Sequence, residues 1–452
     1  MNPLAKLLLI RRLRQQMYGL DRVGLQRLQH KLCAETVRHA VTHSPFFRRH
    51  YQGCDLADFE ELPLVDKAVM MASFSDYNSA GLDREALLAF AIDSEHRAGM
   101  GLYQGRWSVG LSSGTSGNKG LVLLSPDERD RYGCLIAARH GLPPSVKQFR
   151  VLFALRINNP SFENLNRFGL RIVYTDYNRP IEDVIAVVNT QRLNVLAGPP
   201  SFLALIGDQA ARLDHAIEAV VCYAEVLQPE VRARLEKTFA APVVEIYQGS
   251  EGFIAATCRQ GRLHLMEDVV RVEVLPLAGE GAVASASGTA QGTGRIVITD
   301  MHRRSQPILR YQLNDVIEVG ESDCGCGSAF RVVQKIHGRM DDVLTFVDGR
   351  GHRRWLFPDV ASRAVILASD EVEEYQIVQH ALDHLEIRLQ LRDGADHTGI
   401  EAAVARLLRQ RLRDAGVDDP GHPRLEFVLR APEKNAVSGK LIRVQRRFAV
   451  AG

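Results

Sequence analysis

The sequence predicts an α/β protein with a large N-terminal domain, built of helix-covered and mostly parallel sheets, and a small α+β C-terminal domain. Strand-like and helical stretches alternate between residues 151 and 247, which is typical of parallel strands joined by helices. The pattern changes again after "GRMDD" at 338–342. With 452 residues, the chain is longer than a single hydrophobic core usually accommodates. We therefore expect one domain over 1–337 and a second over 343–452.

The composition is that of an ordinary globular protein and excludes several classes of partner. Hydrophobic residues make up 46% of the chain, charged residues 24%, and the net charge is +2. Such a balance creates no long-range field that would attract nucleic acid or a membrane. The N-terminal apolar run is too short for a signal peptide, and no stretch reaches the ~20 apolar residues of a membrane span. We expect a cytoplasmic protein without nucleic-acid or membrane partners.

The elements of the large domain follow from local patterns. Up to about residue 95, apolar positions recur three and four residues apart, which predicts a helical start with a break at Pro45. The strands expected in the parallel sheet are 151–157, 170–176, 194–200, 219–225 and 242–247, and the helices between them are 181–192, 201–213 and 229–240. Ligand-binding residues are expected at the carboxyl ends of such strands, where "YQGSEG" stands at 247–252.

Two further regions complete the chain. Between about 262 and 337, strands alternate with glycine turns, which predicts a β-rich subdomain appended to the sheet. Beyond 342 the sequence predicts strands at 374–380, 386–393 and 424–430 and a helix at 398–416. These elements are sufficient for a compact α+β domain.

The stretch "LSSGTSGNKGLVLLS" at 111–125 suggests a phosphate-binding loop. It is not a Walker-type loop, because its glycines are spaced differently and a strand rather than a helix follows it. It is instead a strand–loop–strand hairpin whose backbone N–H groups, hydroxyls and one lysine could hold an anion. A glycine-rich turn without a ligand explains the same residues. This stretch alone leaves both interpretations open, the anion-binding loop and the simple turn. The residues concerned are Ser112, Ser113, Gly114, Thr115, Ser116, Gly117 and Lys119.

Four later stretches carry side chains suited to a nucleotide. "YQGSEG" offers Tyr247 for base stacking, Ser250 as a donor and Glu251 as a hard oxygen ligand for Mg²⁺. A carboxylate that can accept from ribose hydroxyls, a boundary arginine and a lysine on a glycine-containing turn follow as Asp315, Arg339 and Lys440. Each has an ordinary alternative, such as a core tyrosine or a solvated charge. When all of these residues occur together and in this order, such ordinary roles explain them much less well.

The ordered set resembles the acyl-adenylate-forming superfamily, from about residue 108 to the end. The short helical start, "SSGTSGNKG" and "CRQGRLHLMED" look most like the phenylacetate-CoA ligase branch, with its coenzyme F synthetase-like, deazaflavin-adenylylating members. The resemblance implies that 112–120 binds the β- and γ-phosphates, Tyr247 stacks on adenine, and Ser250 contacts the α-phosphate. It also implies that Glu251 holds Mg²⁺, with Asp315 on the ribose hydroxyls and Arg339 close by.

The same resemblance implies a two-step cycle with a mobile C-terminal lid. The lid would rotate about a hinge at 338–342, at Asp341, so that Lys440 serves adenylation and the opposite face serves thioester formation. A metal and a mobile cation would neutralise the repulsion between two anions, and no covalent enzyme nucleophile is needed. One departure matters: the family loop S-G-T-T-G-x-P-K-G is a residue longer and contains proline. We therefore expect the loop backbone and hydroxyls, rather than Lys119, to bind phosphate.

Four side chains in the β-rich region form a candidate zinc site: Cys258, His264, Cys324 and Cys326. Thiolate and imidazole donors suit a closed tetrahedral zinc site, although C-x-C is tighter than the usual spacing. Some members of the branch carry zinc in a similar pattern, which would make the metal structural. Free cysteines are the alternative, and the odd total of seven argues against a disulfide framework. We take His302 as an ordinary polar residue.

By family analogy, the acyl pocket is expected at three strand ends. Its candidate residues are Pro199, Phe202, Tyr223, Glu225, Gln248 and Gly249. The aromatic members suit a flat apolar or aromatic acid, but core packing explains Tyr223 equally well. Glu225 is either a polar contact to substrate or a helix-capping carboxylate.

The sequence therefore predicts an ATP-dependent, AMP-forming ligase. It would activate a carboxylic acid, aromatic or arylacetic, to an acyl-adenylate and then form a thioester with coenzyme A. One alternative is transfer to another acceptor, namely a carrier protein, a reductase partner or a cofactor hydroxyl. A non-catalytic nucleotide-binding protein is the second. The expected cofactors are ATP, Mg²⁺, coenzyme A and structural Zn²⁺, and a homodimer is left open.

Overall fold

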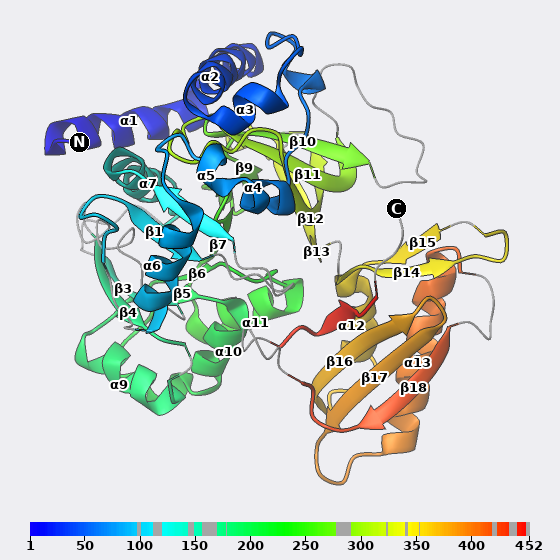
Figure 1. Ribbon diagram of the computed structural model, residues 1–452. Coiled ribbons are helices and arrows are strands. Elements are labelled where there is room, and N and C mark those ends of the chain that lie inside the picture. Colours follow the sequence, from blue (N-terminus) through cyan, green and yellow to red (C-terminus); the bar gives the residue numbers. More distant parts are fainter. Residues whose placement is uncertain are drawn as a thin grey trace.

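The computed structural model describes residues 1–96, 101–111, 120–142, 149–155, 170–177, 179–276, 291–321, 324–339, 342–351, 353–417, 423–433 and 441–448. In Figure 1 the N-terminal helices lie above a long sheet, and the elements from β14 onward form a separate lobe. The fold is mixed α/β with a large sheet that is partly parallel and a smaller α+β part, as the sequence predicts.

The helical start is a series of separate helices, several of which begin at a side-chain N-cap. Asn2, Asp21 and Ser44 accept hydrogen bonds from the first turns of three successive helices. The break expected at Pro45 is present, because Ser44 ends one helix and Pro45 begins the next. The helices are α1 (Pro3–Gly19), α2 (Arg22–His43), α3 (Pro45–His50), η1 (Phe59–Glu61), α4 (Lys67–Ala72), α5 (Phe74–Tyr77) and α6 (Arg84–His96).

The parallel half of the large sheet agrees closely with the predicted strands. It runs in the order β7-β6-β5-β3-β4, with every neighbouring pair parallel. The strands are β3 (Phe149–Ala154), β4 (Leu170–Thr175), β5 (Val195–Gly198), β6 (Ala219–Cys222) and β7 (Val243–Gly249). The helices of this half are α9 (Ile181–Thr190), α10 (Pro200–Asp208), the short η2 (Ala210–Arg212) and α11 (Pro229–Phe239).

The β-rich region continues the same sheet rather than forming a separate one. After β7 the chain turns back at 249–252, so β8 pairs antiparallel with β7, and β8 with five further strands brings the sheet to eleven strands within the described residues. Their order is β8-β9-β13-β12-β11-β10. The strands are β8 (Gly252–Thr257), β9 (Leu263–Leu265), β10 (Val270–Pro276), β11 (Gly292–Asp300), β12 (Tyr311–Gly320) and β13 (Val332–Arg339).

The predicted strand–loop–strand hairpin is present at its two strands. β1 (Ser108–Leu111) pairs antiparallel with β2 (Leu121–Leu124), and the loop between them, 112–119, lies outside the described residues. Helix α7 (Pro126–Arg139) follows at once, starting with a capping box between Ser125 and Glu128. This arrangement excludes a Walker-type loop, in which a helix would follow the loop directly.

Residues 344–444 contain an apolar cluster of their own. A hairpin of β14 (Leu344–Val347) and β15 (Arg353–Leu356) precedes a sheet in the order β18-β17-β16-β19. The remaining elements are α12 (Pro358–Ile366), β16 (Val372–Ala381), β17 (His384–Leu391), α13 (His397–Asp414), β18 (Arg424–Leu429) and β19 (Val444–Arg446). The sequence predicted β16, β17, α13 and β18, but not the hairpin, α12 or β19.

A buried ion pair ties α7 to the sheet. Arg139, the last residue of α7, lies 2.5 Å from the carboxylate of Asp268, and both side chains are almost fully buried. Burial raises the pKa of Asp268, although the charge of Arg139 opposes that shift. Removal of one partner from such a pair leaves a charge buried without its partner.

We expect Arg139→Met to lower the free energy of unfolding by about 3–5 kcal/mol, because Asp268 would lose its hydrogen-bonded cation. Urea unfolding followed by fluorescence measures this loss. The double variant Arg139→Met/Asp268→Leu removes both charges and should regain most of it. A single variant as stable as the unmodified protein would contradict the prediction.

Candidate functional site

Three residues expected at a nucleotide site meet where β7, β12 and β13 come together. Tyr247, near the end of β7, donates a hydrogen bond from its hydroxyl to Asp315 Oδ2 at 2.6 Å. Asp315 stands opposite Arg339 in the β12–β13 register, with Arg339 Nε 3.9 Å from Asp315 Oδ1. Burial raises the pKa of Tyr247, and the neighbouring Asp315 carboxylate raises it further. The phenol therefore stays a donor to the carboxylate.

The turn between β7 and β8 carries the next two candidates. Ser250 Oγ donates to Glu251 Oε2 at 2.9 Å, so the hydroxyl and the carboxylate lie together. A Cβ atom at Gly249 would lie 2.8 Å from that same carboxylate oxygen. Glycine is therefore the residue that leaves Glu251 room at this turn.

A buried arginine and a buried glutamine support this turn from behind. Arg303 donates to the carbonyl of Ser250 at 2.9 Å and to Gln306 Oε1 at 2.7 Å. Gln306 Oε1 also accepts from the N–H of Leu123, and Gln306 Nε2 donates to the carbonyl of Leu121. The Ser250–Glu251 turn and strand β2, which follows the 112–119 loop, are thus held by one hydrogen-bonded group.

Lys67 is a candidate that the sequence reasoning missed. It is the first residue of α4, whose N-cap Asp66 follows Val65, and Val65 pairs with Tyr311 at the start of β12. Burial lowers the pKa of Lys67, while the charge of Glu251 raises it and that of Arg339 lowers it. A lone lysine in a helical start carries no local signal, and only the pairing of Val65 with β12 brings it to the site.

Several predicted site residues lie outside the described residues. They are Ser112, Ser113, Gly114, Thr115, Ser116, Gly117, Lys119, Asp341 and Lys440. The structure describes the strands on both sides of the first group and the chain on both sides of the last two.

The acyl-pocket candidates stand at the carboxyl ends of β5, β6 and β7 but do not all share one face of the sheet. Tyr223 packs on Phe153 with ring centroids 5.4 Å apart, and its hydroxyl donates to the carbonyls of Ala154 and Ala197. Gln248 Oε1 accepts from the hydroxyl of Tyr132 on α7 at 2.6 Å. Tyr132 is a neighbour that the sequence did not indicate.

Phe202 belongs to a different apolar cluster from Tyr223, on the α10 side of the sheet. Pro199 is the N-cap residue of α10. Glu225 accepts a hydrogen bond from the N–H of Ser201 at 3.2 Å, in the first turn of α10. Of the two roles that the sequence left open for Glu225, this contact favours the helix-capping one.

The four metal-ligand candidates are brought together. Cys258 follows β8, His264 lies in β9, and Cys324 and Cys326 lie in the turn before β13, with all ligand atoms within 4.8 Å of one another. Cys324 Sγ is 3.5 Å from Cys258 Sγ and 3.1 Å from His264 Nε2. Tetrahedral zinc with Zn–S of ~2.3 Å places sulfurs about 3.8 Å apart, so the donor set fits.

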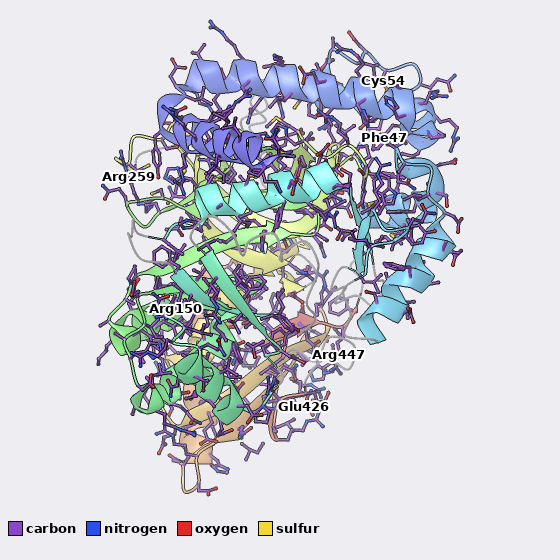
Figure 2. The ribbon with its side chains drawn as sticks, turned by 90° about the vertical axis from the view of Figure 1, so that its left-hand side faces the viewer. Phe47, Cys54, Arg150, Arg259, Glu426 and Arg447 are labelled. Carbon is purple, nitrogen blue, oxygen red and sulfur yellow. The ribbon has the colours of Figure 1, made fainter. Side chains whose placement is uncertain are left out.

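Neighbouring groups hold this cluster in place. His264 Nδ1 lies 2.8 Å from the carbonyl of Phe330, a partner that would direct Nε2 toward the cysteines. Arg259, at one edge of the molecule in Figure 2, donates to the carbonyl of Cys326 and stacks over the ring of Tyr18 on α1. The cluster therefore connects the N-terminal helix to the β-rich half of the sheet.

Comparison with known proteins gives relatives in sequence and neighbours in structure. No family model matches the chain. Phenylacetate-coenzyme A ligase of Thermus thermophilus is 23% identical over 402 residues, 83% of each chain. Protein CapK of Staphylococcus aureus is 25% identical over 248 residues, about half of either chain. A crystal structure of 2-hydroxyisobutyryl-CoA ligase in the postadenylation state aligns with a TM-score of 0.72 at 17% identity, over 96% of this chain and 91% of that one.

The chain has the fold of the adenylate-forming ligases. The resemblance expected from the sequence motifs is thereby confirmed. A second neighbour, o-succinylbenzoate CoA synthetase from Bacillus subtilis, aligns with a TM-score of 0.52 at 15% identity, over 74% of this chain and 67% of that one.

In this adenylate-forming ligase fold, the site lies where the parallel half of the large sheet meets the antiparallel half. Tyr247 and Gln248 end the last parallel strand, while Asp315 and Arg339 come from antiparallel strands. These residues thus stand at the carboxyl end of a parallel strand, the end of an open α/β sheet at which ligand-binding residues are usually found. Among the described residues, no helix combines the length and the apolar character needed to cross a bilayer.

Proposed function

We propose that the protein activates a carboxylic acid with ATP. The carboxylate attacks the α-phosphorus, the bond to pyrophosphate breaks, and an acyl-adenylate forms. The thiol of coenzyme A then attacks the acyl carbon and releases AMP, which gives a thioester. The observation that carries the proposal is the hydrogen-bonded set Tyr247–Asp315, with Ser250–Glu251 on the adjoining turn, where the parallel half of the large sheet meets the antiparallel half.

The roles proposed for the described residues follow from their donors and charges. Asp315, with one oxygen held by Tyr247, has a second carboxylate oxygen that can accept from a ribose hydroxyl. The Tyr247 ring would stack on adenine, and the guanidinium of Arg339 and the hydroxyl of Ser250 would approach phosphate. Glu251 is a hard oxygen donor beside these groups and would hold Mg²⁺, which neutralises phosphate charge when bound.

The catalytic lysine and the lid belong to the same proposal. Residues 1–337 would bind ATP and the acid, 338–342 with Asp341 would act as the hinge, and 343–452 would form the lid that carries Lys440. The thioesterification state of 2-hydroxyisobutyryl-CoA ligase aligns with a TM-score of 0.57, against 0.72 for its postadenylation state. This difference supports a lid arranged for the first half-reaction.

We propose an aromatic or arylacetic acid as the substrate. Tyr132 contacts Gln248, while Phe153 and Tyr223 pack on each other at the carboxyl ends of β3 and β6, and a relative carries the name phenylacetate-coenzyme A ligase. A flat acid suits such walls, because aromatic rings favour stacked or edge contacts. The described contacts of Gln248 involve its amide oxygen, which would leave its N–H donors for the substrate carboxylate.

The remaining proposals concern zinc and location. The cluster Cys258, His264, Cys324 and Cys326 would bind one Zn²⁺ as a closed structural site. Because thiolate ligands persist in a reducing compartment, where ATP and coenzyme A are also available, we propose the cytoplasm. A carrier protein, a reductase or a cofactor hydroxyl is the alternative acceptor, and the exchange experiment below separates this alternative from coenzyme A.

The proposed function predicts acid-dependent exchange of labelled pyrophosphate into ATP. We expect benzoate or phenylacetate to support exchange, and added coenzyme A to yield the thioester by mass spectrometry. Lys440→Ala should lower exchange by about 10²-fold or more, because transition-state charge stabilisation is lost, while ATP binding by calorimetry is kept. Lys237→Ala, at an exposed lysine of α11 with no proposed role, is the control. Exchange without thioester formation would favour another acceptor, and absence of exchange with every acid would contradict the proposal.

Lys67 is expected to contribute positive charge to phosphate binding. Lys67→Met should raise the KM for ATP about tenfold with a smaller effect on kcat, since one charge-assisted contact contributes ~1.5 kcal/mol or more. Lys67→Arg keeps the charge and should restore most of the loss. Equal KM values for ATP in the unmodified and Met variants would contradict this role.

Zinc removal should destabilise the protein without removing a catalytic group. We expect about one zinc per chain by elemental analysis, and a chelator should lower the melting temperature. Cys324→Ser should weaken zinc binding because a thiolate is replaced by a poorer ligand. Cys54→Ser, a cysteine outside the cluster, should retain zinc. A protein without zinc after purification in zinc-supplemented buffer would contradict the prediction.

A further inference from the structure

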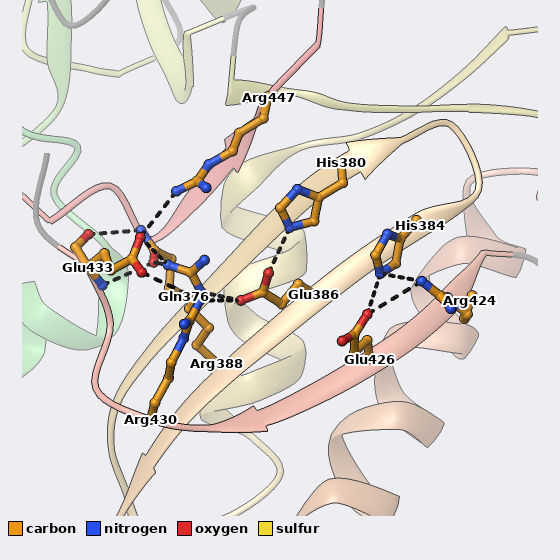
Figure 3. Close-up of polar contacts among 10 residues, drawn as sticks. All are labelled: Gln376, His380, His384, Glu386, Arg388, Arg424, Glu426, Arg430, Glu433 and Arg447. Atoms are coloured by element: carbon orange, nitrogen blue, oxygen red, sulfur yellow. Dashed lines mark hydrogen bonds and ion pairs between the residues drawn. The ribbon is translucent and has the colours of Figure 1, made fainter.

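One face of the C-terminal sheet is polar and carries a connected group of charged side chains. Tyr375, Ile377, Leu385 and Ile387 pack into the apolar cluster with α12 and α13. Since neighbouring residues of a strand point to opposite faces, the alternate positions of β16 and β17 form the other face. Figure 3 shows Gln376, His380, Glu386 and Arg388 there, together with the chain that leaves β18.

Gln376 uses its whole amide to hold two separate pieces of chain. Its Nε2 donates to the carbonyl of Glu433 at 3.1 Å and to the carbonyl of Ile442 at 3.0 Å. Its Oε1 accepts from the N–H of Glu433 at 3.2 Å and from Arg388 at 2.9 Å. Gln376 is 1% exposed, so these bonds are shielded from water.

Arg388 and Glu433 form the charged half of the same arrangement. The guanidinium of Arg388 is 1% exposed and lies 2.8 Å from the Glu433 carboxylate, and it also pairs with Glu386. The hydrogen bond from Arg388 is the largest cause that lowers the pKa of Glu433. The pKa of Glu386 is lowered to about 2, first by its hydrogen bond from Arg388. Both carboxylates therefore stay charged near neutral pH and keep Arg388 in one place.

These contacts fix both ends of the segment that contains the proposed adenylation lysine. The segment leaves the sheet at Glu433 and returns at Ile442, and Lys440 stands two residues before Ile442 in the sequence. The N–H of Ile377 donates to the carbonyl of Arg443 at 2.7 Å, and Arg443 pairs with Glu374. The return of the chain is thus held by β16 at Ile442 and at Arg443.

We propose that Gln376 and Arg388 are positioning residues for the adenylation half-reaction. By joining the two ends of 433–442, the amide of Gln376 sets where the Lys440 segment begins and ends, and the Arg388–Glu433 pair holds that amide. The proposal rests on the proposed function, in which Lys440 acts during adenylation. Consecutive Cα atoms lie 3.8 Å apart, so a displaced anchor at Ile442 displaces the lysine two residues away. A shift of about 1 Å in such a group costs on the order of 10²-fold in rate.

The same face of the sheet supplies a matched control. His384, Arg424 and Glu426 form a second polar group at the β17–β18 edge, with His384 Nε2 2.8 Å from Glu426. Figure 3 shows this group apart from the Glu433 segment. Glu426→Gln therefore perturbs the same sheet without touching either end of the Lys440 segment.

The experiment separates the two half-reactions. The probe acid is benzoate or phenylacetate, whichever supports the faster pyrophosphate exchange by the unmodified protein, and its acyl-adenylate is prepared by synthesis. We expect Gln376→Met to lower exchange at least tenfold, while thioester formation from the supplied acyl-adenylate and coenzyme A stays within about twofold. Glu433→Gln, at a half-exposed side chain, should show the same selective loss at smaller size. Glu426→Gln should leave both half-reactions unchanged.

Hydrogen exchange by mass spectrometry tests the anchoring without any substrate. Peptides over 434–441 should exchange faster in Gln376→Met than in the unmodified protein, and at the unmodified rate in Glu426→Gln. Unchanged exchange in this segment, or equal loss of both half-reactions in Gln376→Met and in Glu433→Gln, would overturn the proposal. If the unmodified protein supports no pyrophosphate exchange with either acid, the proposed function fails instead, and the amide-exchange result still decides whether Gln376 anchors the segment.

Discussion

The candidate site depends on strand β7 having two kinds of neighbour. β7 is parallel to β6 and antiparallel to β8, so the chain must reverse within the few residues after Tyr247. That reversal places Ser250 and Glu251 at the carboxyl end of the parallel strands, where ligand-binding residues of α/β sheets usually stand. It also directs the following strands so that β12 brings Asp315 back to Tyr247, 68 residues further along the chain. A sheet that stayed parallel would carry the next strand away on a helical crossover.

The electrostatics of the site follow from the close approach of these buried side chains. Burial raises the pKa of Asp315, while its hydrogen bond from Tyr247 and the charge of Arg339 lower it. Glu251 brings a second carboxylate close by, and Lys67 comes from a helix that the β12 edge holds through Val65. The carboxylates proposed to bind ribose and metal therefore stand beside the cations proposed to contact phosphate. The helical start belongs to the candidate site, since it supplies Lys67.

The sequence predicted those features that local patterns determine. The parallel strands and their helices were found because buried strands and amphipathic helices differ in period. The four candidate metal ligands were found because cysteine and histidine are distinctive donors, even when sixty residues separate them. Phe202 and Tyr223 were expected in one pocket, yet they lie in different apolar clusters. Which face a side chain takes depends on strand register, and a one-residue shift reverses it. Lys67, Tyr132 and Gln376 were missed because only tertiary pairing brings them to their partners.

Two segments are proposed to act on phosphate: the 112–119 loop and the segment that carries Lys440. A buried glutamine bonds to the described backbone beside each of them. Gln306 bonds through one amide to the backbone of β2, after the 112–119 loop, and its oxygen also accepts from Arg303. Gln376 does the same for the two ends of the Lys440 segment, and its oxygen accepts from Arg388. A neutral amide offers both donors and acceptors to a backbone, so it is buried at lower cost than a charged group. The adjoining arginine polarises the amide oxygen and fixes its orientation. The described backbone beside each segment is therefore fixed by groups that the proposed reaction does not consume.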